Sequence, residues 1–191
     1  LGGSSAGVLG RILTDLHNSL RPSDFGLLQQ KIKHATDQAF RVEQLAKQFF
    51  NTLGDFIAVQ REGQPQSNYS WQIRIQPATR TLPGWDDVED MWGQTGETLA
   101  LLVKSLEELY KNLGELAAEG HDSVEDIMGN MSSVIRRMTE AEAAASGLMH
   151  KPSNELIYWV EVNPRGERLS LNAAPLRVGP LVQKHLWYEK A

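Results

Sequence analysis

The residues in this chain that are best suited to chemistry are its histidines and its clustered carboxylates. A metal site or an acid-base pair needs such side chains at spacings that bring them together. The histidines are scattered, with no spacing typical of metal ligands: His17, His34, His121, His150 and His185. The chain has no cysteine, which excludes disulfides, thiolate ligands and a cysteine nucleophile. We therefore expect no metal site.

Adjacent acidic residues are the second candidate for chemistry. They occur at Asp86-Asp87, Glu89-Asp90 and Glu107-Glu108. Paired carboxylates can hold a metal or exchange protons, but these residues flank a hydrophobic stripe, and the first two pairs fall where a first helical turn favours negative charge. We favour a solvated helix face. A Gly-x-x-x-x-Gly-Lys-Ser/Thr loop and an Asp-Glu-Ala-His sequence are absent, so the chain alone is not expected to hydrolyse ATP, and no catalytic residue is predicted.

Basic residues give the chain its candidate contacts to nucleic acid. Residues 1–80 hold nine Lys and Arg against six Asp and Glu, residues 81–149 hold four against fourteen, and residues 150–191 hold six against four. The acidic middle third should repel phosphate, so contacts are expected mainly from the outer thirds. The candidates, including one pair that interrupts the acidic third, are Arg74, Arg80, Arg136, Arg137, Lys31 and Lys33.

Four of these candidates have a structural alternative. Arg136 and Arg137 would form salt bridges to the acidic third helix, and Lys31 and Lys33 would lie on a solvated helix face. The aromatic residues of the predicted strands, Trp71, Tyr158 and Trp159, could stack on bases, but in a sheet covered by helices they more often belong to the core.

Composition describes an ordinary soluble protein. A length of 191 residues suggests one domain or two small ones, and 41% apolar residues can supply a sizeable core, with a net charge of -5. No apolar run approaches the roughly 20 residues that span a bilayer, and the first residues lack a basic region followed by an apolar one. We expect a cytoplasmic protein without membrane contact.

Helices dominate the hydrophobic pattern. A short helix is predicted over 7–20, and Ser23 or Asp24 is expected to cap the next. Two long helices carry apolar residues at alternating steps of three and four, typical of a heptad seam. The seam positions are Phe25, Leu28, Ile32, Ala35, Ala39, Val42, Ala46, Phe49, Leu53 and Phe56, then Trp85, Val88, Trp92, Thr95, Leu99, Leu102, Leu106, Leu109, Leu113 and Leu116. A fourth helix, over about 124–149, has a methionine-rich stripe that we interpret as core rather than as an adaptable binding surface.

Three strands are predicted, over about 69–76, 156–163 and 167–172. Apolar or aromatic residues alternate with polar ones in the first and third, and the second is rich in β-branched and aromatic residues. Residues 163–166 supply a turn between the last two. The first strand must pair to satisfy its backbone, and the terminal hairpin is its available partner. The expected fold is mainly α, an elongated antiparallel helical bundle on a small three-stranded antiparallel sheet.

The end of the chain carries a family resemblance. A tryptophan-bearing strand, a turn and then Leu171-Asn-Ala-Ala-Pro-Leu-Arg-Val-Gly-Pro-Leu181 resembles the segment of DinG-type DNA helicases, relatives of XPD, that leads back into the first motor domain. Leu1-Gly-Gly-Ser-Ser resembles the stretch shortly after that family's DEAH box. The resemblance implies that residues 1–172 are the insertion called the arch, between the DEAH box and the Thr-Ser-Ala-Thr motif, and that 173–191 return to the motor.

The resemblance also implies a function. The parent would be an ATP-dependent 5′-3′ DNA helicase, a hydrolase of the DNA-repair type that binds ATP and Mg. The fragment would lack a catalytic site and a cofactor, and would guide or exclude a DNA strand. Its partners would be the remainder of the motor and single-stranded DNA, and exposed apolar residues near the C-terminus could let the excised fragment dimerise. The alternative is a stand-alone helical-hairpin module that uses its seam for protein interaction or dimerisation.

Overall fold

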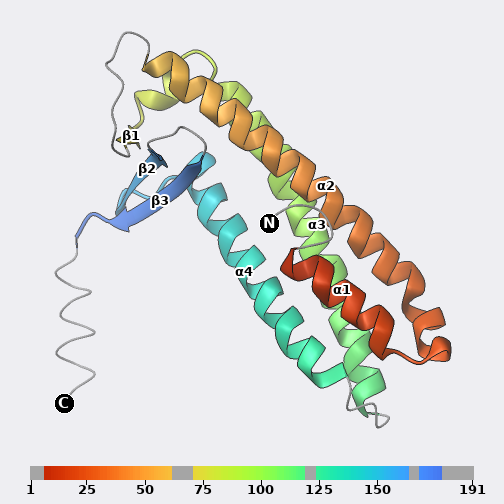
Figure 1. Cartoon of the computed structure of the whole chain (residues 1–191). Helices are drawn as coiled ribbons and strands as arrows, with labels where there is room; N and C mark the ends of the chain where they lie inside the picture. Colours follow the sequence, from red (N-terminus) through yellow and green to blue (C-terminus); the bar gives the residue numbers. More distant parts are fainter. Residues whose placement is uncertain (1–6, 62–70, 119–123, 164–167, 178–191) are drawn as a thin grey trace, which may run out of the picture. The chain divides into compact units, whose positions relative to one another are not determined.

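The computed structural model describes residues 7–61, 71–118, 124–163 and 168–177. Within these ranges the chain forms four α-helices, one short 3-10 helix and three strands (Figure 1). In chain order they are α1 (Val8–Ser19), α2 (Pro22–Gln60), β1 (Trp71–Ile75), η2 (Thr79–Thr81), α3 (Trp85–Ala118), α4 (Glu125–Met149), β2 (Leu156–Val162) and β3 (Leu169–Pro175). The predicted class, mainly α with a small antiparallel sheet, is confirmed.

The chain divides into two compact units. The helical unit comprises residues 1–49 and 91–143, and the sheet unit comprises residues 50–90 and 144–191. The boundaries lie inside α2, α3 and α4, so each of these helices contributes residues to both units. Both units are assembled from segments that are distant in the sequence. The predicted boundary between residues 172 and 173 stays a prediction.

The core of the helical unit follows the predicted stripes. Leu106, Leu109 and Leu113 of α3 have no exposed surface, and they belong to one hydrophobic cluster with Leu16 of α1 and Met131 of α4. Burying an aliphatic side chain of this size stabilises a fold by about 1.5–3 kcal/mol. The methionine-rich stripe of α4 is thus part of the core, as predicted.

The start of α2 differs from the prediction. The helix begins at Pro22, so Ser23 and Asp24 lie within its first turn and do not precede it. The Ser23 hydroxyl donates to the Asp24 carboxylate at 3.1 Å, and the Phe25 N–H donates to the Arg21 carbonyl at 2.8 Å. The prediction of a Ser23 or Asp24 cap is wrong because proline, with its fixed φ and no N–H, suits the first helical position.

The sheet has the order β1-β2-β3 with antiparallel neighbours. Ile73 lies opposite Val160, and Val160 lies opposite Leu171. The pairing of the early strand with the terminal hairpin is therefore confirmed. Strand β3 runs to Pro175, three residues past its predicted end, so the predicted boundary after residue 172 falls inside it. Residues 69–70, 164–167 and 178–191, which belong to the predicted strands, turn and returning segment, lie outside the described residues.

Alternation gives the sheet two different faces. Ile75, Tyr158, Val160 and Val162 are buried on one face, as expected for side chains two residues apart on a pleated strand. Trp85, at the start of α3, packs edge-to-face on Phe56 of α2 with ring centroids 5.3 Å apart. This buried aromatic pair belongs to the core of the sheet unit.

Candidate functional site

Two of the candidate arginines lie in the sheet unit, and they have different surroundings. Arg80 follows β1 in η2, and its side chain is 15% exposed. Its Nη1 donates to the Met149 carbonyl oxygen at 2.8 Å, and its Nη2 donates to the Leu148 carbonyl oxygen. Both carbonyls lie in the last turn of α4, where helical carbonyls have no partner within the helix. Arg80 therefore closes the C-terminal end of α4.

The charge of Arg80 is balanced inside the same unit. Its Nη1 lies 3.7 Å from Glu89 Oε1, and its guanidinium carbon lies 5.2 Å from the ring centroid of Trp85. The Trp85 indole N–H donates to the same Glu89 oxygen at 2.6 Å. Burial lowers the pKa of Arg80 from its ordinary value, while Glu89 acts in the opposite direction. These contacts give Arg80 a structural role.

Arg74, by contrast, is exposed in the middle of β1. The register places it opposite Trp159 of β2, which in turn lies opposite Asn172 of β3. These residues form one row across the sheet, on the face opposite Val160. Among the described residues, the Arg74 guanidinium has no hydrogen bond or ion pair. The row combines a free cation, an indole and an amide, which suit a phosphate, a base face and a base edge.

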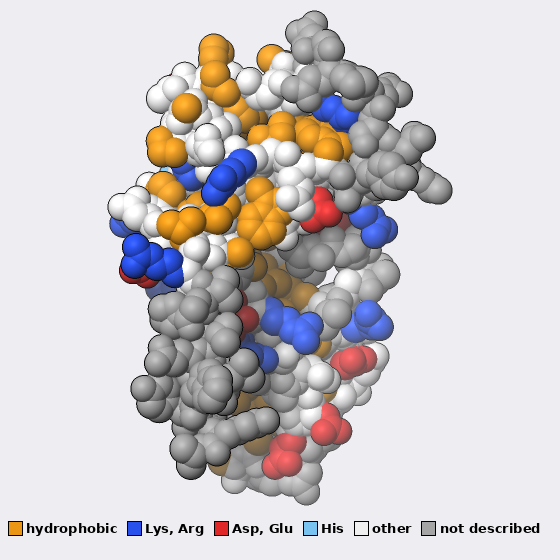
Figure 2. All heavy atoms as spheres, turned by 90° about the vertical axis from the view of Figure 1, so that its left-hand side faces the viewer, with side chains coloured by type: hydrophobic (Ala, Val, Ile, Leu, Met, Phe, Trp, Pro, Cys, Tyr) orange, Lys and Arg blue, Asp and Glu red, His pale blue; other side chains and the backbone are white. Residues whose placement is uncertain are grey.

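Trp159 has an unsatisfied polar group in this row. Its indole N–H is buried without a hydrogen-bond partner, although the residue as a whole is half-buried. The other aromatic candidates are already engaged: Tyr158 is buried and its hydroxyl accepts from the Ser153 N–H at 3.0 Å, and Arg61 stacks on Trp71 at 4.3 Å. The core interpretation thus holds for Tyr158. Figure 2, which views the side on which Figure 1 draws the sheet, shows lysine and arginine side chains beside exposed hydrophobic ones.

The remaining candidates lie on helices of the helical unit. Lys33 pairs with Asp37 at 2.8 Å, which raises the pKa of Lys33, and Arg136 pairs with Glu140 at 3.8 Å. Both pairs are exposed and link residues four apart on one helix. The predicted salt bridge from Arg136 to the third helix is thus replaced by a pair within α4, because side chains four apart share a helix face.

Lys31 is half-buried on α2, and Arg137 is exposed on α4. Neither makes an ion pair with any residue within the described ranges. The six candidates are divided between two units, four in the helical unit and two in the sheet unit. The row of Arg74, Trp159 and Asn172 is therefore the candidate site, since the strand register places an arginine without an ion pair among the described residues opposite an aromatic residue.

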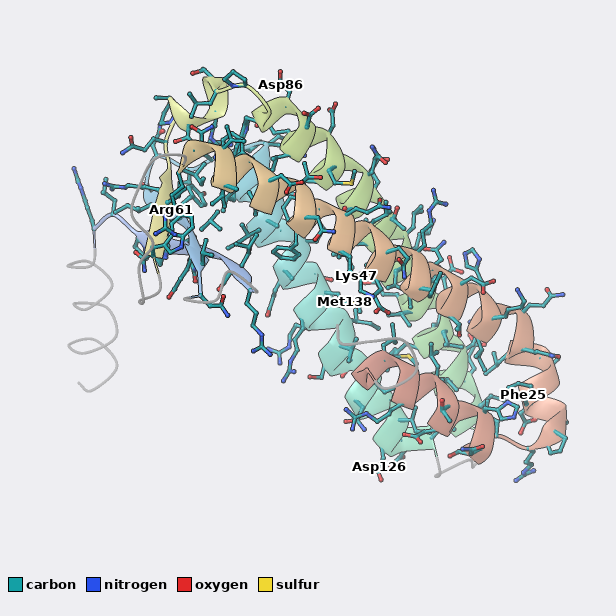
Figure 3. All side chains as sticks on the ribbon, turned by 45° about the horizontal axis from the view of Figure 1, so that its top comes forward. Phe25, Lys47, Arg61, Asp86, Asp126 and Met138 are labelled. Atoms are coloured by element: carbon teal, nitrogen blue, oxygen red, sulfur yellow. The ribbon has the colours of Figure 1, made fainter. Side chains whose placement is uncertain are left out.

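Two of the three acidic pairs take the solvated arrangement that we favoured, whereas in the third, Glu89-Asp90, Glu89 is half-buried and contacts Trp85 and Arg80. Asp86 and Asp87 are exposed in the first turn of α3, and Glu107 and Glu108 are exposed in its later part. Figure 3 shows the Asp86 side chain pointing away from the helix. Across the residues that the structure describes, no three His, Cys, Asp or Glu side chains are grouped so that they could hold a metal ion.

Sequence reasoning did not select Trp159 and Asn172 as site residues. Alternation within 156–162 places Trp159 on the face opposite Tyr158, but its position beside Arg74 depends on the register between strands that are 80 residues apart. Asn172 joins the row because the register between β2 and β3 places it opposite Trp159.

Comparison with protein-family models, with curated proteins and with solved structures finds no match for this chain. In the described part of the chain, no helix combines the length and the apolar character needed to cross a membrane.

Proposed function

We propose that this chain is the arch insertion of a DinG-type, XPD-like ATP-dependent DNA helicase. It is a non-catalytic element that guides or excludes one DNA strand while ATP hydrolysis elsewhere drives movement. The observation that carries the proposal is the sequence from the tryptophan-bearing β2 through Leu171-Asn-Ala-Ala-Pro-Leu176 and on to Leu181, which resembles the segment leading back into the first motor domain of those helicases.

The fold is compatible with such an element. The sheet pairs residues 71–75 with a hairpin that follows two further long helices. A small sheet of this kind can anchor helices to a neighbouring domain, because its strands pair with one another and its buried face is filled. The proposed role requires no catalytic group within this chain.

The row of Arg74, Trp159 and Asn172 supplies the contact to single-stranded DNA in this proposal. An indole can stack on any base, and a free guanidinium can neutralise a phosphate. Glu161 lies on the same face, opposite Gln72, and its negative charge restricts phosphate to the neighbourhood of Arg74. The site is therefore small and assists a motor, and it does not by itself hold DNA tightly.

The test uses the full-length protein that contains this chain. We expect its gene to encode a phosphate-binding loop upstream and a Thr-Ser-Ala-Thr strand immediately downstream, and the protein to unwind a duplex with a 5′ single-stranded tail when ATP is present. Arg74→Glu should weaken binding of single-stranded DNA and reduce the slope of log affinity against log salt by about 0.7, the value for one phosphate contact on a single strand. ATP hydrolysis without DNA should be unchanged.

Two controls separate the site from the function. Arg74→Lys keeps the charge and should retain most of the affinity, while Arg11→Glu changes an exposed arginine on α1, in the helical unit, and should have little effect. An unchanged salt slope in Arg74→Glu would reject the row as the DNA contact. Absence of ATP-dependent unwinding by the intact protein would reject the helicase assignment. Tight, salt-sensitive DNA binding by the 191-residue chain alone would contradict a merely assisting role.

The alternative, a module that recruits a partner through its heptad seam, receives no support from the burial of the seam. On α3 nine of the ten seam positions are buried, and Leu116 is half-buried. Side chains that are already packed within the monomer are not available to a partner helix.

A further inference from the structure

The two outer edges of the sheet differ in how their backbone groups are satisfied. The backbone groups of the even-numbered residues of β3 form the hydrogen bonds to β2. Two such bonds, one just beyond each end of β3, establish this alternation. The Asn163 N–H donates to the Arg168 carbonyl at 3.1 Å, and the Leu176 N–H donates to the Glu155 carbonyl at 2.7 Å. Because antiparallel pairs alternate, the odd residues of β3 point their N–H and C=O groups away from β2.

This alternation leaves an open edge on β3. Leu169, Leu171 and Ala173 present outward N–H and C=O groups, and among the described residues these groups have no hydrogen-bond partner. The strand is seven residues long, contains no charged side chain and has a proline only at its last position. Natural proteins guard edge strands with charges, prolines, bulges or short length. β3 has little of this protection.

The opposite edge, on β1, is guarded. β1 is five residues long and carries Arg74 at an outward position. The Thr79 hydroxyl donates to the Arg74 carbonyl at 3.2 Å and accepts from the Gln76 N–H at 3.1 Å. Pro77 follows at once. The β1 edge is therefore closed by the residues that directly follow it in the sequence. The β3 edge has no such partner among the described residues, so another strand can pair with it.

A row of alternating backbone donors and acceptors can hydrogen-bond to the edge of another strand. The β3 edge of a second copy of this chain supplies such a row. If two copies meet antiparallel with Leu171 opposite Leu171 of the second copy, Leu169 lies opposite Ala173 of that copy. All of these residues point their backbone groups outward, so each opposed pair can exchange two hydrogen bonds. The sequence of β3 thus satisfies the requirement of a two-fold interface, in which one surface is complementary to itself.

The side chains agree with this register. On the Val160 face, the half-buried Leu171 would meet its own copy, and the half-buried Leu169 would meet Ala173. On the Trp159 face, Ser170 would lie opposite Asn172 of the second copy, a polar pair able to hydrogen-bond across the strands. No charge meets a like charge at any opposed position. A shift by one residue would instead oppose outward with inward backbone groups.

We propose that the β3 edge is a homodimerisation surface, on which two copies of this chain join their sheets into one six-stranded antiparallel sheet through Leu169 to Ala173. This inference rests on the hydrogen-bond pattern of the sheet, and it holds whether or not the chain belongs to a helicase. A contact along one strand is small compared with the surfaces of permanent dimers, so the dimer dissociates on dilution.

The test uses single-cysteine variants of the 191-residue chain, which has no cysteine of its own. In the proposed register the two Leu171 Cα atoms are about 5.5 Å apart, within the range that a disulfide spans. The two Ala173 Cα atoms are about 14 Å apart, from a rise of about 3.4 Å per residue. Ala173 is the more exposed of the two residues, so random collision would favour it. Under mild oxidation Leu171→Cys should form covalent dimers at least tenfold faster than Ala173→Cys.

A second pair of variants checks the contact without oxidation. Ser170→Lys with Asn172→Lys opposes lysines across the interface and should abolish the dimer in sedimentation or light scattering. Ser170→Lys with Asn172→Glu opposes unlike charges and should restore it. Equal cross-linking of the two cysteine variants, or a wild-type chain that stays monomeric up to millimolar concentration, would overturn the proposal, as would identical association of the two charge variants. Circular dichroism confirms that each variant is folded.

Discussion

Removing the Arg80 side chain should lower the unfolding free energy of the sheet unit. The size of the loss follows from the contacts that Arg80 makes. Its guanidinium donates to the Leu148 and Met149 carbonyls at the end of α4 and pairs with Glu89 at 3.7 Å. Hydrogen bonds to a charged group contribute about 1.5–3 kcal/mol each. Since Arg80 retains some exposure and water can reach part of the helix end in its absence, Arg80→Ala should cost about 2–4 kcal/mol of unfolding free energy.

The measurement is urea denaturation followed by helical circular dichroism and by tryptophan fluorescence. With a slope of about 2 kcal/mol/M, the midpoint of Arg80→Ala should fall by about 1–2 M urea. Arg80→Lys can offer one donor to the helix end and should lose roughly half as much. The two probes must give coincident curves, because a chain with two compact units can unfold in more than one step.

Arg74→Ala is the matched control, since Arg74 lies on the same sheet unit but is exposed and has no ion pair within the described residues. Its effect should stay within about 0.5 kcal/mol, as is usual for surface positions. If Arg80→Ala and Arg74→Ala change the midpoint equally, closure of the α4 end by Arg80 does not stabilise the fold and the reasoning fails. If Arg74→Ala lowered the urea midpoint and Arg80→Ala did not, Arg74 and not Arg80 would be the stabilising residue.

Five further substitutions test the packing, the backbone and one surface ion pair. Leu109→Ala, at a position with no exposed surface, should lower the unfolding free energy by about 2–5 kcal/mol. Leu101 is 54% exposed on the same helix, so Leu101→Ala should change the unfolding free energy by less than about 0.5 kcal/mol. Equal urea midpoints for the two variants would refute the buried seam. Gly84→Ala should lower the unfolding free energy by about 1–2 kcal/mol, because Gly84 has a φ of 88°. Gly93→Ala, within α3 and with no atom within 4 Å of the new Cβ, should raise the melting temperature. A change of melting temperature in the same direction for both variants would contradict the backbone argument. Lys33→Ala removes an exposed pair with Asp37, so it should leave the urea midpoint almost unchanged, and any difference should vanish in high salt. A clear fall in the midpoint that persists in high salt would show that the pair is not merely a surface contact.

Helix content and core positions were predictable because they depend on local periodicity. The alternating steps of α3 identified its seam, and Leu102, Leu106 and Leu109 are fully buried. The ends of α3 and α4 agree with the prediction to within two residues. The start of α2 was not predicted correctly, because Ser23 satisfies the composition of a cap while Pro22 already satisfies the geometry of the first turn.

The candidate site was predictable only in part. The need for backbone pairing predicted that the first strand joins the terminal hairpin. That need does not specify which residue of β1 lies beside Trp159, or which face of the sheet Trp159 occupies. That neighbour, Arg74, follows from a register set by the burial of Ile75 and Val160 on the other face.

By itself the sequence determined the helices, their buried stripes and the existence of three strands, since these features repeat within a few residues along the chain. The tertiary structure decided what depends on distant segments. It turned Arg80 into the partner of the α4 end, 68 and 69 residues away, and left Arg74 exposed. It also closed the β1 edge with Thr79, whereas none of the described residues pairs with the outer edge of β3. A charged side chain or a strand edge is satisfied by whatever lies beside it in space, and side-chain periodicity carries no information about that neighbour.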